Sequence, residues 1–130
     1  MENIEVIHQH HKEIASHTVF LKNEISFLLK ILKNCYSTSI NIERTKLLDS
    51  YWKRFDNHTL ALDQVLNRIH KEEKSLAIHY KDVVMDTETL QLKENQLATK
   101  FNDIASEVRL LKESFYEFMQ GCNACALKTS

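Results

Sequence analysis

The sequence predicts an all-α fold, an antiparallel up-down-up three-helix bundle with coiled-coil-like heptad packing. Two observations lead to this prediction. The 130 residues contain no proline and a single glycine, and the turns of β-rich folds draw heavily on these two residue types. Apolar side chains also recur every three or four residues over most of the chain, a spacing typical of helices that pack in bundles. At this length we expect one domain, residues 1–130.

The first apolar stripe predicts a helix over about residues 4–35. Its members are Ile4, Ile7, His11, Ile14, Thr18, Leu21, Ile25, Leu28, Leu32 and Cys35. The spacing is lost across residues 36–41, a run of turn-forming and capping residues (YSTSIN). Either Asn41 or Ser39 is expected to cap the second helix, and Glu43 in its first turn is favoured by the helix dipole.

The second and third stripes predict helices over about residues 41–84 and 87–120, with a loose tail at 121–130. The second stripe consists of Leu48, Trp52, Phe55, Thr59, Leu62, Leu66, Ile69, Glu73, Leu76, Tyr80 and Val83, and the third of Leu90, Glu94, Leu97, Phe101, Ile104, Val108, Leu111, Phe115 and Phe118. The spacing carries through residue 85, so one continuous rod is the alternative to a turn there. We expect the turn, because a rod of about 80 residues would leave the first helix a poor partner for its length.

Composition narrows the possible functions. Seventeen basic and eighteen acidic residues are mixed along the chain, and without a basic cluster to neutralise phosphates we expect no nucleic-acid binding. No apolar run is long enough to span a bilayer, so no membrane association is expected. Three cysteines and no secretory signal favour a cytoplasmic protein. Glycine-rich phosphate loops and nucleophile elbows are absent, so we expect no enzyme activity and no cofactor.

A metal-binding bundle is the alternative that the seven histidines raise. Antiparallel packing brings the first half of helix 1 and the second half of helix 2 to the same end of a bundle. Residues three or four apart on one helical face can hold the same ion, and this spacing selects His8, His11, His70 and Glu73 as candidate ligands of one transition-metal ion. Surface histidines around a hydrogen-bonded His11 in the core, or a pH-responsive interface, are the other interpretations.

Three cysteines form a second candidate cluster. Helices 1 and 3 end at the same pole, so Cys35 is expected near Cys122 and Cys125, which form a C-x-x-C pair. Three thiolates could hold zinc with a fourth ligand, or the pair could work as a redox dithiol. Apolar padding at the end of the bundle is the alternative, because cysteine buries well.

The far end of the bundle is the candidate partner surface. If the chain folds back about residues 38 and 85, helix 2 extends beyond helix 1 and leaves a tip of only two helices. Glu73 and Glu94 on the core stripes are then expected either to face solvent there or to specify register. Two helices cannot cover the apolar residues of such a tip, and the candidate contact residues are Leu76, Val83, Val84, Met85, Leu90 and Leu92.

Three segments resemble a family of small uncharacterised bacterial three-helix, coiled-coil-like proteins. They are residues 20–32 (FLKNEISFLLKIL), 68–76 (RIHKEEKSL) and 110–119 (LLKESFYEFM). The resemblance implies the three-helix plan and brings no activity or site residue with it. Because the tip is expected to leave apolar surface uncovered and no catalytic constellation is found, the leading functional hypothesis is a non-catalytic interaction or scaffold protein that self-associates or docks a protein partner.

Overall fold

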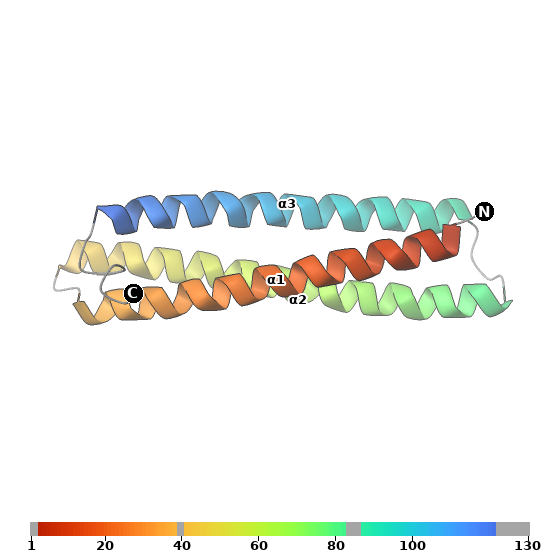
Figure 1. Ribbon diagram of the computed structural model, residues 1–130, viewed down its shortest axis with the longest axis horizontal. Helices are drawn as coiled ribbons and strands as arrows, with labels where there is room; N and C mark the ends of the chain where they lie inside the picture. Colours follow the sequence, from red (N-terminus) through yellow and green to blue (C-terminus); the bar gives the residue numbers. More distant parts are fainter. Residues whose placement is uncertain (1–2, 39–40, 83–86, 122–130) are drawn as a thin grey trace.

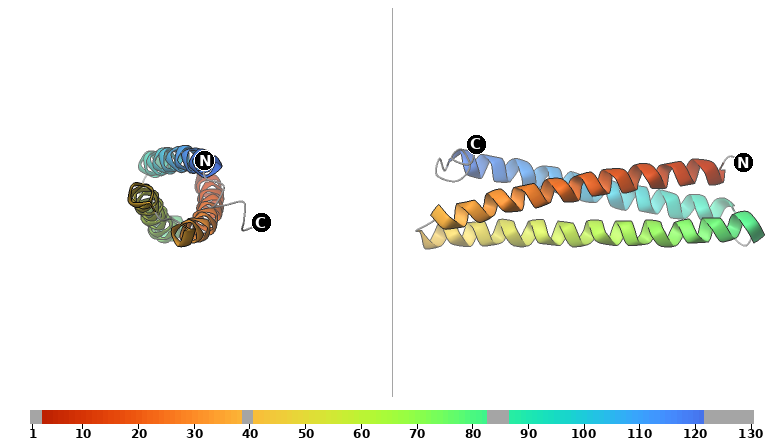
Figure 2. Two further views of the ribbon diagram at one scale, coloured as in Figure 1. Left: turned by 90° about the vertical axis from the view of Figure 1, so that its left-hand side faces the viewer. Right: turned by 60° about the horizontal axis from the view of Figure 1, so that its bottom comes forward.

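The computed structural model describes residues 3–38, 41–82 and 87–121, which form three long helices (Figure 1). They are α1 (Asn3–Thr38), α2 (Ile42–Asp82) and α3 (Thr87–Gln120). Each helix contacts the other two, and α2 runs opposite to α1 and α3. Viewed end-on, the helices surround a common core (Figure 2). The predicted three-helix bundle is confirmed, and α2 and α3 are two helices packed side by side rather than one rod.

Local side-chain hydrogen bonds explain where α1 ends and α2 begins. The Oδ1 atom of Asn41 accepts hydrogen bonds from the backbone N–H groups of Glu43 at 2.8 Å and Arg44 at 3.3 Å, which confirms Asn41 as the cap of α2. Helix α1 continues to Thr38, beyond its predicted end. The hydroxyls of Ser37 and Thr38 donate to carbonyls one turn earlier, at 2.7 and 3.0 Å, and so satisfy acceptors that a helix end leaves without partners.

The main core fills most of the bundle and is apolar. Leucine, isoleucine and valine from all three helices pack around the aromatic pair Phe55 and Phe115, whose ring centroids lie 5.6 Å apart in an edge-to-face arrangement. Thr18 and Thr59 sit on the core stripes. Their hydroxyls donate to the carbonyls of Ile14 and Phe55 one turn earlier, so neither hydroxyl is buried without a partner.

The prediction of a two-helix tip with uncovered apolar residues is wrong for the residues that the structure describes. Leu76 and Leu90 are each only 5% exposed, and they pack with Ile7 of α1 in a small second cluster. Folding about residue 38 would have placed Ile7 opposite Ile69. The turn is instead centred later in the chain, because Asn41 caps α2, and α1 therefore reaches the level of Leu76. Of the remaining candidate contact residues, Leu92 is exposed, and residues 83–85 lie outside the described residues.

Candidate functional site

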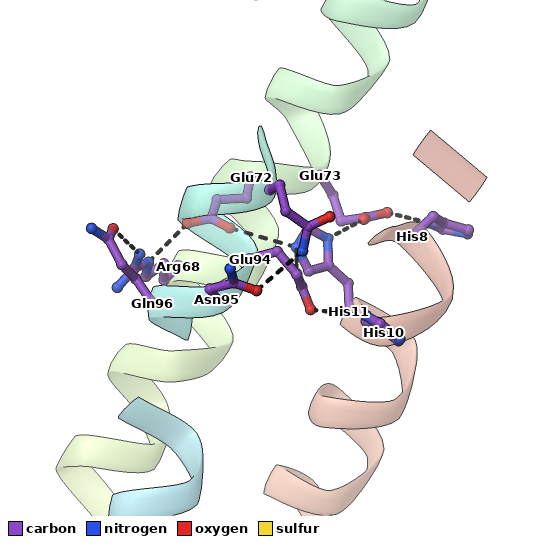
Figure 3. A network of polar contacts seen from close by, with 10 residues as sticks. His8, His10, His11, Arg68, Glu72, Glu73, Glu94, Asn95 and Gln96 are labelled. Carbon is purple, nitrogen blue, oxygen red and sulfur yellow. Dashed lines mark hydrogen bonds and ion pairs between the residues drawn. The ribbon is translucent and has the colours of Figure 1, made fainter. Parts of the chain in front are cut away.

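A layer of ionisable side chains separates the two apolar clusters. His11 occupies a core position on α1 between Ile7 and Ile14 and is only 2% exposed. It is enclosed by carboxylates from the other two helices and flanked by two further histidines of α1 (Figure 3). We call this layer the His/Glu centre, and it consists of His8, His10, His11, Glu72, Glu73 and Glu94.

The carboxylate of Glu73 joins two histidines. His11 donates through Nδ1 to Oε2 of Glu73 at 2.5 Å, and His8 donates through Nδ1 to the other oxygen, Oε1, at 2.6 Å. His8 and His11 stand three residues apart on α1, so their rings project from the same face toward α2. The His8 side chain is about half exposed, so this side of the centre opens to solvent while His11 lies behind it.

Glu94 of α3 faces the opposite side of the His11 ring. Its Oε1 atom lies 3.0 Å from Nε2 of His11, and its Oε2 atom lies 3.4 Å from Nδ1 of His10. Glu94 is only 3% exposed, so it is not the solvated residue expected at a two-helix tip. Neither His11 Nε2 nor Glu94 Oε1 makes a well-directed hydrogen bond, although both atoms are buried. Such atoms are costly in a core, so this contact is not an optimised structural pair.

Glu72 links the centre to the surface between α2 and α3. Its Oε1 atom lies 3.5 Å from Nε2 of His11, and its Oε2 atom accepts a hydrogen bond from Nε of Arg68 at 2.8 Å. Arg68 also donates to the side chain of Gln96 at 3.4 Å. Polar contacts therefore run continuously from Gln96 through Glu72 and His11 to His8 on the other side of the bundle.

The carboxylates hold His11 in its charged form. Burial by itself favours the neutral ring, but the close carboxylates of Glu72 and Glu94, the hydrogen bond to Glu73 and the charge of Glu94 outweigh it and raise the pKa of His11 to about 10. Burial would likewise raise the pKa of Glu72, yet the close His11 ring and the hydrogen bond from Arg68 lower it. Without a metal ion, His11 is therefore an imidazolium at neutral pH with carboxylates at both ring nitrogens.

The structure brings together three of the four predicted metal-ligand candidates. His8, His11 and Glu73 are in direct contact, whereas His70 is exposed on α2 and is not among the residues that contact them. Glu72, Glu94 and His10 were not predicted as members of the site. The sequence could have indicated Glu94, because a carboxylate on an apolar stripe needs a polar partner. Glu72 lies beside the stripe, so no feature of the sequence indicated it.

The carboxylates and imidazoles touch each other directly rather than surrounding an open centre. Accordingly, no three His, Cys, Asp or Glu side chains of the described residues are already arranged to hold a metal ion. Cys35 is buried at the far end of the main core, and Cys122 and Cys125 lie outside the described residues. The predicted cysteine cluster is therefore neither assembled nor excluded.

Known proteins provide no assignment for this site. Protein families, curated proteins and solved structures were all compared with the chain, and none matches it significantly. Within residues 3–38, 41–82 and 87–121, no helix combines the length and the apolar character needed to cross a membrane.

Proposed function

We propose that this bundle binds a divalent transition-metal ion through His8, His11 and Glu73. The observation that carries the proposal is the carboxylate of Glu73 in contact with Nδ1 atoms of both histidines. Two histidines and one carboxylate form a recurrent ligand set for zinc and for non-haem iron, in which the remaining coordination positions stay open.

Glu94 is placed to orient the His11 ring if His11 binds a metal. A histidine that binds a metal through one ring nitrogen usually donates the other N–H to a carboxylate, which fixes the orientation of the ring. Here Nδ1 of His11 faces Glu73 and Nε2 faces Glu94 at 3.0 Å. Metal at Nδ1 would leave the Nε2–H facing Glu94, which would then fix the orientation of the ring.

The side-chain movement that metal binding requires is small. Bonds of about 2.1 Å in a tetrahedral site place neighbouring ligand atoms about 3.4 Å apart. The two N···O distances at Glu73 are 2.6 and 2.5 Å, so each must lengthen by about 0.8–0.9 Å. Rotation of the half-exposed His8 ring and of the Glu73 side chain, which is 30% exposed, can supply these changes while the buried His11 stays in place.

The charge balance also favours a divalent ion. Three ionised carboxylates with Arg68 and the His11 imidazolium leave this layer one negative charge in excess when His8 and His10 are neutral. A divalent metal that displaces the His11 Nδ1 proton adds one net positive charge and brings the layer to neutrality. The exchange of a proton for a divalent ion would therefore remove the excess negative charge of the layer.

Metal content and affinity test the proposal. Untagged protein purified without chelators is expected to carry about one zinc, iron or manganese ion per chain, measured by mass spectrometry. After chelation, titration with Zn²⁺ should give one site, and His8→Ala should weaken it at least tenfold. His70→Ala is the matched control, since it removes an exposed histidine from α2 without touching the centre. Equal affinities for wild type and the His8→Ala variant would refute the assignment.

A second candidate function, docking of a protein partner, is supported by a different surface. Phe20 and Phe27 stand seven residues apart on α1, and their side chains are 63% and 58% exposed. Exposed aromatic pairs are common anchors of protein interfaces. If this face binds a partner protein, the double variant Phe20→Ser/Phe27→Ser should lose partner binding without a change in the stability of the bundle. The control variant Leu60→Ser, at an exposed position of α2, should keep partner binding.

A further inference from the structure

The exposed side of α1 carries a stripe of residues at alternating spacings of three and four. Residues with this spacing lie along one line on a helix, as the core stripe does on the opposite side. Every member is exposed, including Phe20 at 63% and Phe27 at 58%. We call this line the outer stripe, and it consists of Glu13, Ser16, Phe20, Asn23, Phe27 and Lys30.

The middle of the outer stripe presents no charged side chain to solvent. Two charged residues of α1 fall between residues 16 and 27, and both bind other helices of the bundle. Lys22 forms an ion pair with Asp63 of α2, and Glu24 accepts a hydrogen bond from Lys112 of α3 at 2.8 Å. An exposed, uncharged stretch with two aromatic side chains has the composition of the core of a protein interface.

The two ends of the outer stripe carry opposite charges. Glu13 and Lys30 are both exposed, and neither forms an ion pair within the part of the chain that the structure describes. Two copies of the stripe aligned in parallel would place like charges side by side, which is unfavourable. An antiparallel copy instead places Glu13 of each chain opposite Lys30 of the other.

We infer that the outer stripe pairs with the same stripe of a second, antiparallel copy of this chain. The inference rests on the second candidate function, docking through Phe20 and Phe27, and it names the partner. The spacings 3, 4, 3, 4, 3 read the same in both directions, so every member faces another, as in an antiparallel coiled coil. Phe20 then faces Asn23 of the second copy and Phe27 faces its Ser16, so that each large ring packs against a smaller side chain.

The contact is small, because each copy contributes one helix. Residues 13–30 span about 25 Å of α1 at 1.5 Å per residue. An interface of one helix from each copy lies at the low end of the size range of specific complexes. We therefore expect a reversible, symmetric dimer with a Kd in the micromolar range.

Sedimentation equilibrium of the full-length protein tests this pairing, at low ionic strength and with chelator present so that a bound metal plays no part. Wild type should pass from monomer to dimer between about 1 and 500 µM. Glu13→Lys and Lys30→Glu should each weaken the dimer at least about tenfold, because each variant turns two attractive pairs into two repulsive ones and an exposed pair changes affinity up to about fivefold. The combined variant Glu13→Lys/Lys30→Glu exchanges the charges and should restore the affinity to within about threefold of wild type. Lys71→Glu makes the same charge change at an exposed position of α2 and should leave the dimer unchanged.

The outcomes separate this inference from the docking function on which it rests. A wild type that stays monomeric at about 500 µM refutes the dimer, whereas docking of a different protein through Phe20 and Phe27 then stands. The inference is equally refuted if the combined charge variant dimerises no more tightly than either single variant. It also fails if Phe20→Ser/Phe27→Ser dimerises as wild type does.

Discussion

Replacing His11 with leucine in the metal-free protein should lower the free energy of unfolding by about 3–5 kcal/mol, the usual cost of removing one partner from a buried ion pair. Most of this cost comes from Glu94. Its side chain is only 4% exposed, and after the replacement its remaining partner is His10 at 3.4 Å, a histidine that is about half exposed. Glu72 keeps Arg68, and Glu73 keeps His8 and is itself 30% exposed, so these two carboxylates contribute little.

Replacing both partners should largely reverse the loss. The variant with His11→Leu and Glu94→Leu presents two apolar side chains between the main core and the cluster of Ile7, Leu76 and Leu90, which removes the unpaired charge and joins the two clusters. Exchange of a buried ion pair for apolar residues is often neutral or stabilising. We therefore expect an unfolding free energy within about 1 kcal/mol of wild type, or above it.

Urea denaturation followed by circular dichroism, with chelator present, measures both variants against His70→Leu, which changes an exposed histidine. A total stability of about 5–15 kcal/mol leaves the single variant measurable. The reasoning fails if His11→Leu alone is as stable as wild type, or if the double variant is no more stable than the single one.

Four further predictions concern pH, capping and metal removal. Because the pKa of His11 is raised to about 10, its contribution to stability is fully present below the unfolded value near 6.5 and is lost as the pH rises through about 10; urea midpoints between pH 7 and 10.5 should fall more steeply in chelated wild type than in the double variant. Burial lowers the pKa of His58, with Glu107 opposing and Arg54 adding to the shift. Folding therefore favours the neutral ring, and the resulting stability is present above pH 6.5 and lost as the pH falls below it, a component that His58→Gln should remove from an acid titration. Asn41→Ala should cost about 1 kcal/mol by removing the cap of α2, and Asn34→Ala, in an exposed position of α1, provides the comparison in the same melt. Chelating a site loaded at a hundred times its Kd should remove about 2.7 kcal/mol and lower the Tm of wild type, but not that of His8→Ala.

The fold was predictable because it depends on repeated local signals. The three apolar stripes, the absence of proline and the capping residue Asn41 each specify helices and their limits without knowledge of long-range contacts. Register was not predictable in the same way. Register depends on where the first turn is centred. An error of a few residues in that position led to the prediction that Leu76 and Leu90 lie on an exposed tip, whereas they lie in the core.

The site was partly predictable for the same reason. His8 and His11 were identified from their spacing on one helix, and Glu73 from its spacing with His70 on the next. His70 fulfilled the same spacing rule but points to solvent, because a spacing of three fixes neighbours on a helix without fixing which face meets the core. Glu72 and Glu94 join His11 only through packing of α2 and α3 against α1, and no pattern within a single helix specifies such a contact.

The position of the His/Glu centre argues that it is kept for more than stability. An apolar layer between Ile7 and Ile14 would continue the core without interruption, whereas the existing layer buries His11 and Glu94 with two atoms that lack well-directed hydrogen bonds. Sites that serve binding commonly cost stability. The double variant separates the two roles. If it gains stability and loses metal binding, the centre is retained for the metal at the expense of stability. If it gains stability and wild type binds no metal, the ion pairs serve to fix the register of the three helices.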